Sequence, residues 1–250
     1  MKNKIWVCPL IVMGLVIILT NSCNKDDNNP VSITDKDGNV YTSVTIGTQV
    51  WLVENLKTTK YRNGDLIGTT TPSTLDITAE TTPKYQWAYD GNESNAATYG
   101  RLYTWYAVTD IRNLCPTGWH VPSDVEWTTL ENYLIANGYN YDGTTTENKI
   151  AKSLATATNW TSSSNTGVVG NTDFPGKRNA TGFSALPGGI REGGGTFTGD
   201  LSFYGLWWSS TESDWDQYLA MIGYIHADNS YFDRGGYLKV RGASVRCVMD

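Results

Sequence analysis

Few side chains in this 250-residue sequence combine the type and spacing that catalysis requires. Either of the two histidines, His120 and His226, is a formal candidate for the base of a Ser-His-Asp triad, because triads are defined by geometry alone. Neither lies in a Gly-x-Ser-x-Gly nucleophile signature, and we interpret His120 as a packed, hydrogen-bonded residue. The 25 acidic residues always allow some acid–base pair for glycoside hydrolysis, and no spacing singles one out. We therefore predict no catalytic residue; a hydrolase or other enzyme of unrecognised type is the less favoured alternative.

Metal and cofactor chemistry is poorly represented as well. The histidines have no metal-ligand spacing, and residues 35–39, Asp-Lys-Asp-Gly-Asn, lack the later glycine and glutamate of an EF-hand, so we interpret them as a turn. Cys8 and Cys23 belong to an N-terminal segment, which leaves Cys115 and Cys247 as the one pair in the folded part. We predict a disulfide between them and neither a metal nor a cofactor.

Ligand binding is better supported, because residues 204–237 mix aromatic side chains with Asp, Asn, Ser and Gln. Tyr and Trp offer rigid faces and the polar residues offer adaptable hydrogen bonds, a mixture that also suits the faces and hydroxyls of sugar rings. We interpret Trp207 and Trp208 as core residues. The predicted ligand-binding residues are Trp215, Tyr218, Asp228, Asn229 and Tyr231. Ordinary loop packing is the open alternative for all five.

The first 27 residues indicate where the protein works. Lys2 and Lys4 precede an apolar run over 5–19, which is shorter than the roughly 20 residues of a membrane-spanning helix, and small residues then lead to Cys23. This pattern resembles a bacterial lipoprotein signal, although Thr20 replaces the leucine of the strict motif. We expect a signal peptide at 1–22 and a lipidated polar tether at 23–32, with Cys23 anchored in outer-membrane lipid. An ordinary secretory signal with an incidental cysteine is the alternative.

Residues 24–27, Asn-Lys-Asp-Asp, refine that address. They resemble the short acidic signal that sends lipoproteins of Bacteroidota to the outer face of the outer membrane. They are also compatible with a plain polar tether that keeps the domain clear of the lipid. We predict a lipid-anchored, surface-exposed protein of the cell outer membrane, with a periplasmic orientation left open.

Composition limits the remaining chain. Without residues 1–22 it carries 17 basic and 25 acidic side chains, a formal balance of −8, which argues against nucleic acid as a partner. No charge run or Pro/Ser stretch suggests a second boundary, so we expect one domain at 33–250. The full sequence, with 25 glycines, ten tryptophans and 15 tyrosines, has the composition of an aromatic-packed, turn-rich module.

The secondary-structure signals are of mixed type. Alternating residues at 40–46 and 50–53, joined by Gly47-Thr48, predict a hairpin. Ser123 and Glu126 form a capping box that starts a helix, which Asn137-Gly138 ends, and a second helix is expected over 147–155. After residue 183 the pattern is one of short strands and glycine turns, ending in a strand at 245–248. Strands, two helices and further strands make an α+β domain.

Several motifs resemble a known family. Over about 35–250 the chain resembles the Fibrobacter succinogenes major paralogous domain, on the motifs at 37–41, 51–56, 99–107, 115–122, 182–189, 207–210 and 244–248. That resemblance implies a bacterial surface lipoprotein of a family without an established activity.

A more distant similarity concerns architecture. Residues 120–127, the later Trp-Ser-Ser segment and the closing Val-Arg-Cys-Val are similar to formylglycine-generating-enzyme-like domains, a branch of the C-type lectin-like fold. This similarity implies a single C-type lectin-like domain of two helices and short, twisted antiparallel strands. The Glu-Pro-Asn or Gln-Pro-Asp motif of calcium-dependent lectins is absent. We predict a binding or adhesion module for an extracellular glycan or protein ligand; a structural surface-display protein is the alternative.

Overall fold

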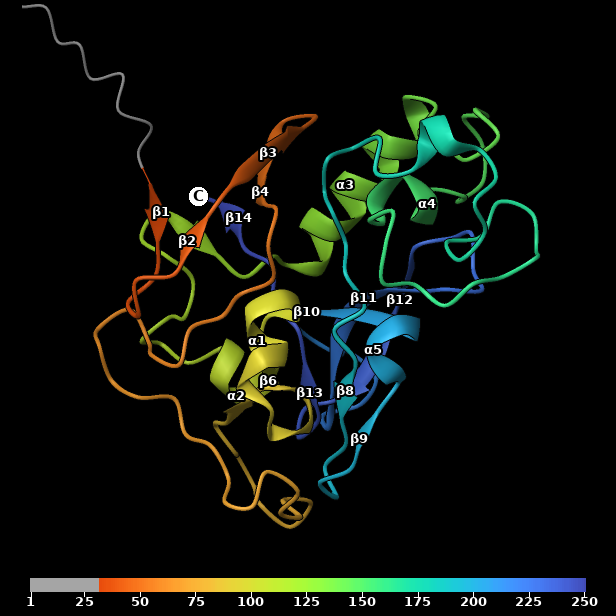
Figure 1. Cartoon of the computed structure of the whole chain (residues 1–250). Coiled ribbons are helices and arrows are strands. Elements are labelled where there is room, and N and C mark those ends of the chain that lie inside the picture. The colour runs from red at the N-terminus through yellow and green to blue at the C-terminus, as the bar shows by residue number, and fades with distance from the viewer. Residues whose placement is uncertain (1–31) are drawn as a thin grey trace, which may run out of the picture. The chain divides into compact units, whose positions relative to one another are not determined.

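The computed structural model describes residues 32–250, and it contains four antiparallel sheets (Figure 1). The expected signal peptide and Cys23 tether lie outside these residues, apart from the last tether residue, Ser32. The smallest sheet pairs β1 (Ile33–Thr34) with β2 (Val40–Tyr41). The second has the order β3 (Ser43–Ile46), β4 (Gln49–Leu52), β14 (Val248–Met249) and β7 (Trp119–His120).

The two larger sheets are built from the middle and the C-terminal part of the chain. One has five strands in the order β5 (Gln86–Trp87), β6 (Leu102–Thr104), β13 (Gly242–Ala243), β8 (Ile190–Arg191) and β9 (Phe197–Thr198). The other is the meander β10 (Tyr204–Glu212), β11 (Leu219–His226) and β12 (Asp233–Leu238). Figure 1 shows the C-terminal strand β14 beside β4 from the start of the domain, where Val248 pairs with Trp51.

The helices confirm the α+β class and correct the predicted helix count. Residues 32–250 contain five α-helices, not two: α1 (Glu93–Tyr99), α2 (Trp105–Val108), α3 (Asp124–Ala136), α4 (Ala151–Leu154) and α5 (Asp200–Phe203). Two short 3-10 helices, η1 (Tyr89–Gly91) and η2 (Pro175–Lys177), accompany them. The sequence pattern missed α1, α2 and α5, because helices of seven, four and four residues are too short for a clear helical period to emerge.

The predicted capping box at the start of α3 is confirmed. Ser123 Oγ accepts from the Glu126 backbone N–H, and the Glu126 side chain accepts from the Ser123 N–H. Trp127 and Leu130 are buried on the inner face, as their spacing predicted. The second predicted helix, 147–155, is wrong in its start: α4 begins at Ala151, because Glu147 has a left-handed φ of 61° that a helix cannot contain.

The core has two aromatic parts. In one, the ring centroids of Trp51 and Trp127 lie 4.7 Å apart. Phe183 and Trp207 belong to the same part and pack edge-on against each other. The other surrounds the disulfide, with Leu52, Tyr103 and Trp208 among its members. Trp207 and Trp208 are both buried, as predicted, because neighbouring residues of β10 point to opposite faces of the sheet.

A buried cation joins the first of these core parts to the C-terminal segment. Arg246 is fully buried, and its guanidinium lies 4.2 Å from the Phe183 ring centroid. It donates to the Phe183 carbonyl and, at 2.7 Å, to Asn55 Oδ1. Asn55 Oδ1 also accepts from Trp207 Nε1 at 2.8 Å. Burial lowers the pKa of Arg246, and the charge of Glu54 offsets this lowering only in part.

The predicted disulfide between Cys115 and Cys247 is present, with a Cα–Cα distance of 6.1 Å. Both cysteines are buried, so the bridge ties the segment before β7 to the segment before β14 inside the core. It closes a loop that spans a sequence separation of 132 residues.

Removal of this bridge is expected to destabilise the domain. The variant Cys115→Ala with Cys247→Ala should lose about 2 to 5 kcal/mol in the free energy of unfolding, because a long loop is no longer closed in the unfolded chain. Urea unfolding of the oxidised wild type and the variant measures the difference. Equal midpoints and slopes for the two proteins would contradict a stabilising bridge.

Candidate functional site

Two of the predicted ligand-binding residues form an exposed aromatic surface at the turn between β10 and β11. Trp215 and Tyr218, which we call the aromatic ledge, are 62% and 64% exposed. Every other tryptophan in residues 32–250 is buried or half-buried. A Cβ added at Gly236 of β12 would lie 3.1 Å from the Trp215 ring, so the edge of the indole rests on a glycine and the rest of it faces solvent.

The turn that carries the aromatic ledge is fixed by hydrogen bonds. Ser213 Oγ accepts from the backbone N–H groups of Trp215 and Asp216, each at 3.3 Å. The Asp216 carboxylate accepts from the Tyr218 N–H at 2.8 Å. Buried Lys239 donates to Glu212 and to the Gln217 carbonyl. The two rings are therefore presented by a turn that is held at both ends.

The other three predicted residues lie elsewhere. Asp228, Asn229 and Tyr231 belong to the turn between β11 and β12, at the opposite end of β11. A strand of eight residues is about 25 Å long at roughly 3.3 Å per residue, so the five predicted residues cannot form one surface. The sequence interval 213–233 contains two separate turns.

Asn229 is a correction, because it is only 4% exposed and not a surface residue. Its Oδ1 accepts from the Tyr231 N–H at 3.2 Å, the local bond by which Asn side chains stabilise turns. Asp228 is exposed, but its carboxylate accepts from Ser163 at 2.6 Å and from Asn165 at 2.8 Å. These two residues join loops, whereas Tyr231 lines a hollow of about 300 Å³ with Glu131, Asn148 and Arg234.

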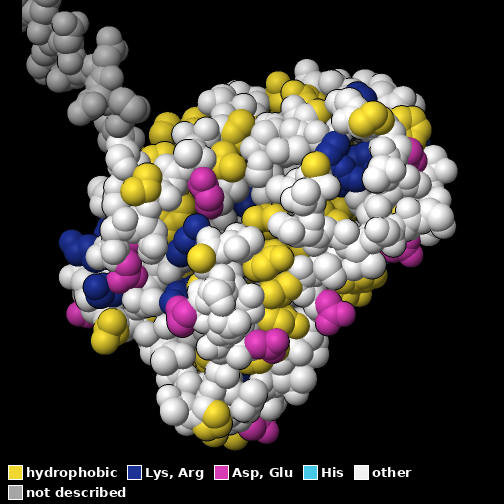
Figure 2. Space-filling view, in the orientation of Figure 1, with side chains coloured by type: hydrophobic (Ala, Val, Ile, Leu, Met, Phe, Trp, Pro, Cys, Tyr) yellow, Lys and Arg dark blue, Asp and Glu magenta, His cyan; other side chains and the backbone are white. Residues whose placement is uncertain are grey.

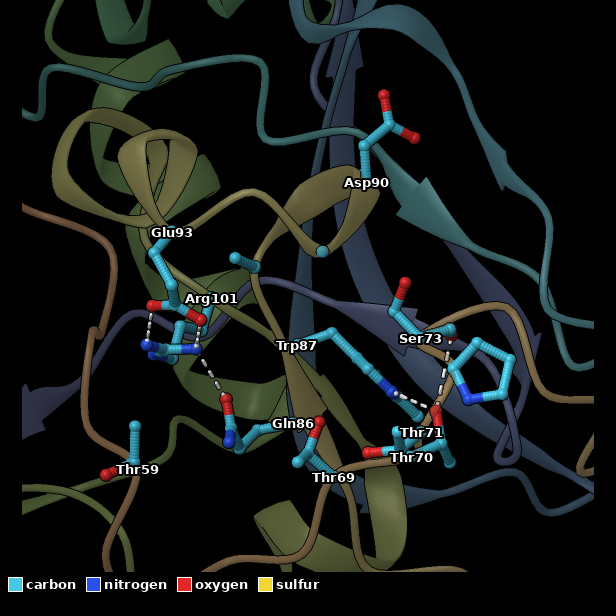
Figure 3. Close-up of a pocket in the computed structure, with 13 residues that line it drawn as sticks. Thr59, Thr69, Thr70, Thr71, Ser73, Gln86, Trp87, Asp90, Glu93 and Arg101 are labelled. Carbon is cyan, nitrogen blue, oxygen red and sulfur yellow. Dashed lines mark hydrogen bonds and ion pairs between the residues drawn. The ribbon is translucent and has the colours of Figure 1, made fainter.

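Sequence reasoning missed a polar hollow of about 340 Å³ between β5, η1, α1 and the loop before β5 (Figure 3). Its lining is rich in hydroxyl groups, from Thr59, Thr69, Thr70, Thr71 and Ser73. Gln86, Trp87, Asp90, Glu93 and Arg101 complete the polar and aromatic part of the wall. The segments that form its walls are far apart in the sequence. The one sequence signal for the hollow was therefore the density of threonine in 69–82.

Hydrogen bonds hold one wall of this hollow in place. Arg101 donates to Gln86 Oε1 at 2.9 Å and to both oxygens of Glu93, and its Nε donates to the Lys57 carbonyl. On the other side, Trp87 Nε1 donates to Thr70 Oγ1 at 2.9 Å, and the Arg191 guanidinium lies 4.1 Å from the Trp87 ring centroid. The groups that form this wall therefore already have hydrogen-bond partners, and the positions of these side chains are fixed before a ligand binds.

His120 is hydrogen-bonded, as predicted, and both of its partners are carboxylates. Its Nδ1 lies 2.7 Å from Asp250 and its Nε2 2.8 Å from Glu126. Burial lowers the pKa of His120, but the hydrogen bonds to Asp250 and Glu126 outweigh burial and raise it. In residues 32–250, no hydrogen bond joins either histidine to a serine, threonine or cysteine side chain.

The described part of the chain holds neither a candidate metal site nor a candidate membrane span. No group of three or more His, Cys, Asp and Glu side chains in residues 32–250 has the geometry of a metal site. None of the helices in the same residues has the length and apolar character to cross a bilayer.

Fold and surface together define a disulfide-bonded α+β domain with an exposed aromatic ledge and a polar hollow. The chain belongs to the Fibrobacter succinogenes major domain family, whose family model matches residues 44–249 and confirms the resemblance found in the motifs. Searches of the curated proteins and of the solved structures gave no match. The C-type lectin-like fold therefore stays a prediction.

The His120 contacts predict a pH-dependent contribution to stability. A pKa raised in the folded state means that protonated His120 stabilises the fold below the unfolded value of about 6.5, and that this contribution is lost as the pH rises through the folded value. His120→Gln should therefore lower the free energy of unfolding more at about pH 5.5 than at about pH 8.5.

His226 supplies the matched control, because burial lowers its pKa. The sign is opposite there: the folded state disfavours the proton, so His226→Gln should cost relatively less stability at the lower pH. Urea denaturation of the wild type and both variants at the two pH values gives the comparison. A His120→Gln effect that is independent of pH would contradict the ionic role.

Proposed function

We propose that this protein is a bacterial surface lipoprotein whose domain binds an extracellular glycan or protein without catalysing a reaction. The observation that carries the proposal is the exposure of Trp215 and Tyr218 on a chain that buries or half-buries its other described tryptophans. A large aromatic side chain can bury roughly 150 to 250 Å² of its surface, and this favourable burial is absent when the side chain stays in solvent. Contact with a ligand is the state in which that area is covered.

The rigidity of the aromatic ledge supports the same role. Binding normally costs about 0.5 to 1.5 kcal/mol for each flexible side chain that it immobilises. Tyr and Trp have only two side-chain torsions, and the bonds from Ser213 and Asp216 fix the backbone that carries them. A ligand therefore meets rings whose backbone is already ordered.

The proposed anchor has separate support, which comes from the sequence alone. The signal-like residues 1–22, Cys23 and the acidic residues after it favour attachment to outer-membrane lipid and exposure on the cell surface. A display protein without a ligand is the second candidate, and an enzyme of unrecognised type is the third. The exposed aromatic ledge favours binding over display, because display alone gives no reason to expose two large rings.

A glycan array tests the binding role on the soluble chain that starts at residue 24 and so omits Cys23. We expect specific binding that a calcium chelator does not abolish, since residues 32–250 offer no metal cluster. Replacing Trp215 and Tyr218 by Ala should weaken binding at least roughly tenfold, the size of effect found at aromatic hot spots.

Tyr231→Ala is the matched control, because Tyr231 is also an exposed aromatic residue but lies at the far end of β11. It should bind like the wild type. An identified ligand that binds the Trp215→Ala, Tyr218→Ala variant with unchanged affinity would refute the aromatic ledge as the contact surface. Silence across the array would favour a protein ligand or a display role.

A further inference from the structure

A second hollow adjoins the polar hollow of Figure 3. It measures about 310 Å³ and is lined by Thr74, Asp90, Gly194, Gly195, Thr196 and Phe197. Asp90 lines both hollows, and the neighbours Ser73 and Thr74 lie one in each. The two hollows therefore meet at Asp90. We call the pair the Asp90 groove; two adjoining hollows give room for an extended ligand that crosses Asp90.

The charge of the Asp90 groove limits what it binds. Among the lining residues of the two hollows, Glu93 and Arg101 are paired with each other, which leaves the Asp90 carboxylate as the uncompensated charge. The face of the domain in Figure 2 is formed mostly by uncharged polar side chains and backbone, with charged groups scattered over it. Phosphate, sulfate and uronate groups would be repelled at Asp90, so a neutral ligand fits better.

Asp90 is held ready for a ligand. Its backbone is left-handed, with a φ of 55°, a conformation that Asn and Asp adopt more readily than most other residues with a side chain. The turn is tied on both sides, because the Gly91 N–H donates to the Ala88 carbonyl and the Asn92 N–H donates to the Tyr89 carbonyl. Figure 3 shows no bond from the carboxylate to the other lining residues, so its oxygens are open to donors from outside.

The remaining walls match a hydroxyl-rich chain. Threonine and serine hydroxyls both donate and accept, as sugar hydroxyls do, and a carboxylate accepts strongly from hydroxyl donors. Phe197 is half-exposed in the second hollow and offers an apolar surface to the C–H face of a ring. A peptide would need deeper apolar pockets for its side chains than this lining provides.

We propose that the Asp90 groove is a binding site for a neutral, linear oligosaccharide, with hydroxyls of the sugar over Asp90 donating to its carboxylate. This site deepens the proposed binding function but does not depend on the aromatic ledge, which lies on the β10–β11 turn. No covalent step is involved.

The test is affinity gel electrophoresis of the soluble chain from residue 24 in gels that contain neutral polysaccharides (xyloglucan, mannan and laminarin) or acidic ones (alginate and polygalacturonate). We expect at least one neutral polysaccharide to retard the wild type and the acidic ones not to do so. Asp90→Asn keeps a residue that tolerates the left-handed backbone and removes the charge, so it should weaken retardation at least roughly tenfold.

A blocking variant gives an independent readout. Gly194 lines the second hollow in an ordinary backbone conformation, and a Cβ added there meets no atom within 4 Å. Gly194→Gln should therefore fold normally and obstruct the groove. Gly176→Gln, at an equally open glycine that lines neither hollow, is the matched control and should bind like the wild type.

The outcomes separate the two surfaces. Loss of retardation in Asp90→Asn and Gly194→Gln but not in Trp215→Ala supports the groove. Loss in Trp215→Ala alone overturns the groove and leaves the proposed function standing on the aromatic ledge. Retardation by none of the neutral polysaccharides, or stronger retardation by the acidic ones, overturns the groove as a site for neutral sugars.

Discussion

The fold depends on how one buried cation is satisfied. Arg246 is fully buried and forms no ion pair within residues 32–250, and an isolated charge in a protein interior is unfavourable by several kcal/mol unless hydrogen bonds and ring faces replace water. Here the Phe183 carbonyl, Asn55 Oδ1 and the face of Phe183 take that role for most of the guanidinium, while its Nε has no hydrogen-bond partner within residues 32–250. Because Asn55 Oδ1 also accepts from Trp207, three distant segments must converge before the charge is tolerated. The polar cluster therefore specifies one arrangement of the core.

Both candidate surfaces are connected to this cluster. Asn55 Nδ2 donates to the Tyr99 carbonyl, and the next residue, Leu56, accepts from the Arg101 N–H, so the cluster positions the arginine in the wall of the polar hollow. On the other side, Trp207 belongs to β10, the strand that leads to the aromatic ledge. The disulfide at Cys247 fixes the residue next to Arg246. One interior arrangement thus orients surfaces that lie on different sheets.

The correct predictions rest on short local sequence patterns or on the number of cysteines. The capping box at Ser123, the hairpin of β3 and β4, the burial of Trp207 and Trp208, and the Cys115–Cys247 bridge each follow from a short pattern or from counting. The Asp90 groove could not be predicted, because its walls come from segments around 59, 70, 90 and 195 that meet only in the tertiary structure. The five predicted ligand-binding residues were separated for the same kind of reason. A sequence interval of about 20 residues looks continuous, whereas β11 places its two ends far apart.

Native-state hydrogen exchange of Asn55→Ala tests the central role of the buried cluster most directly. We predict that the Arg101 and Trp208 amides, which bond to Leu56 and Ser244, lose protection together by roughly tenfold or more, because the substitution removes the acceptor of the buried Arg246 Nη2 and of the Trp207 indole N–H. Loss of protection confined to residues next to Asn55, with the Trp208 amide unchanged, would contradict it. The cluster would then be a local feature and not the constraint that joins the two surfaces.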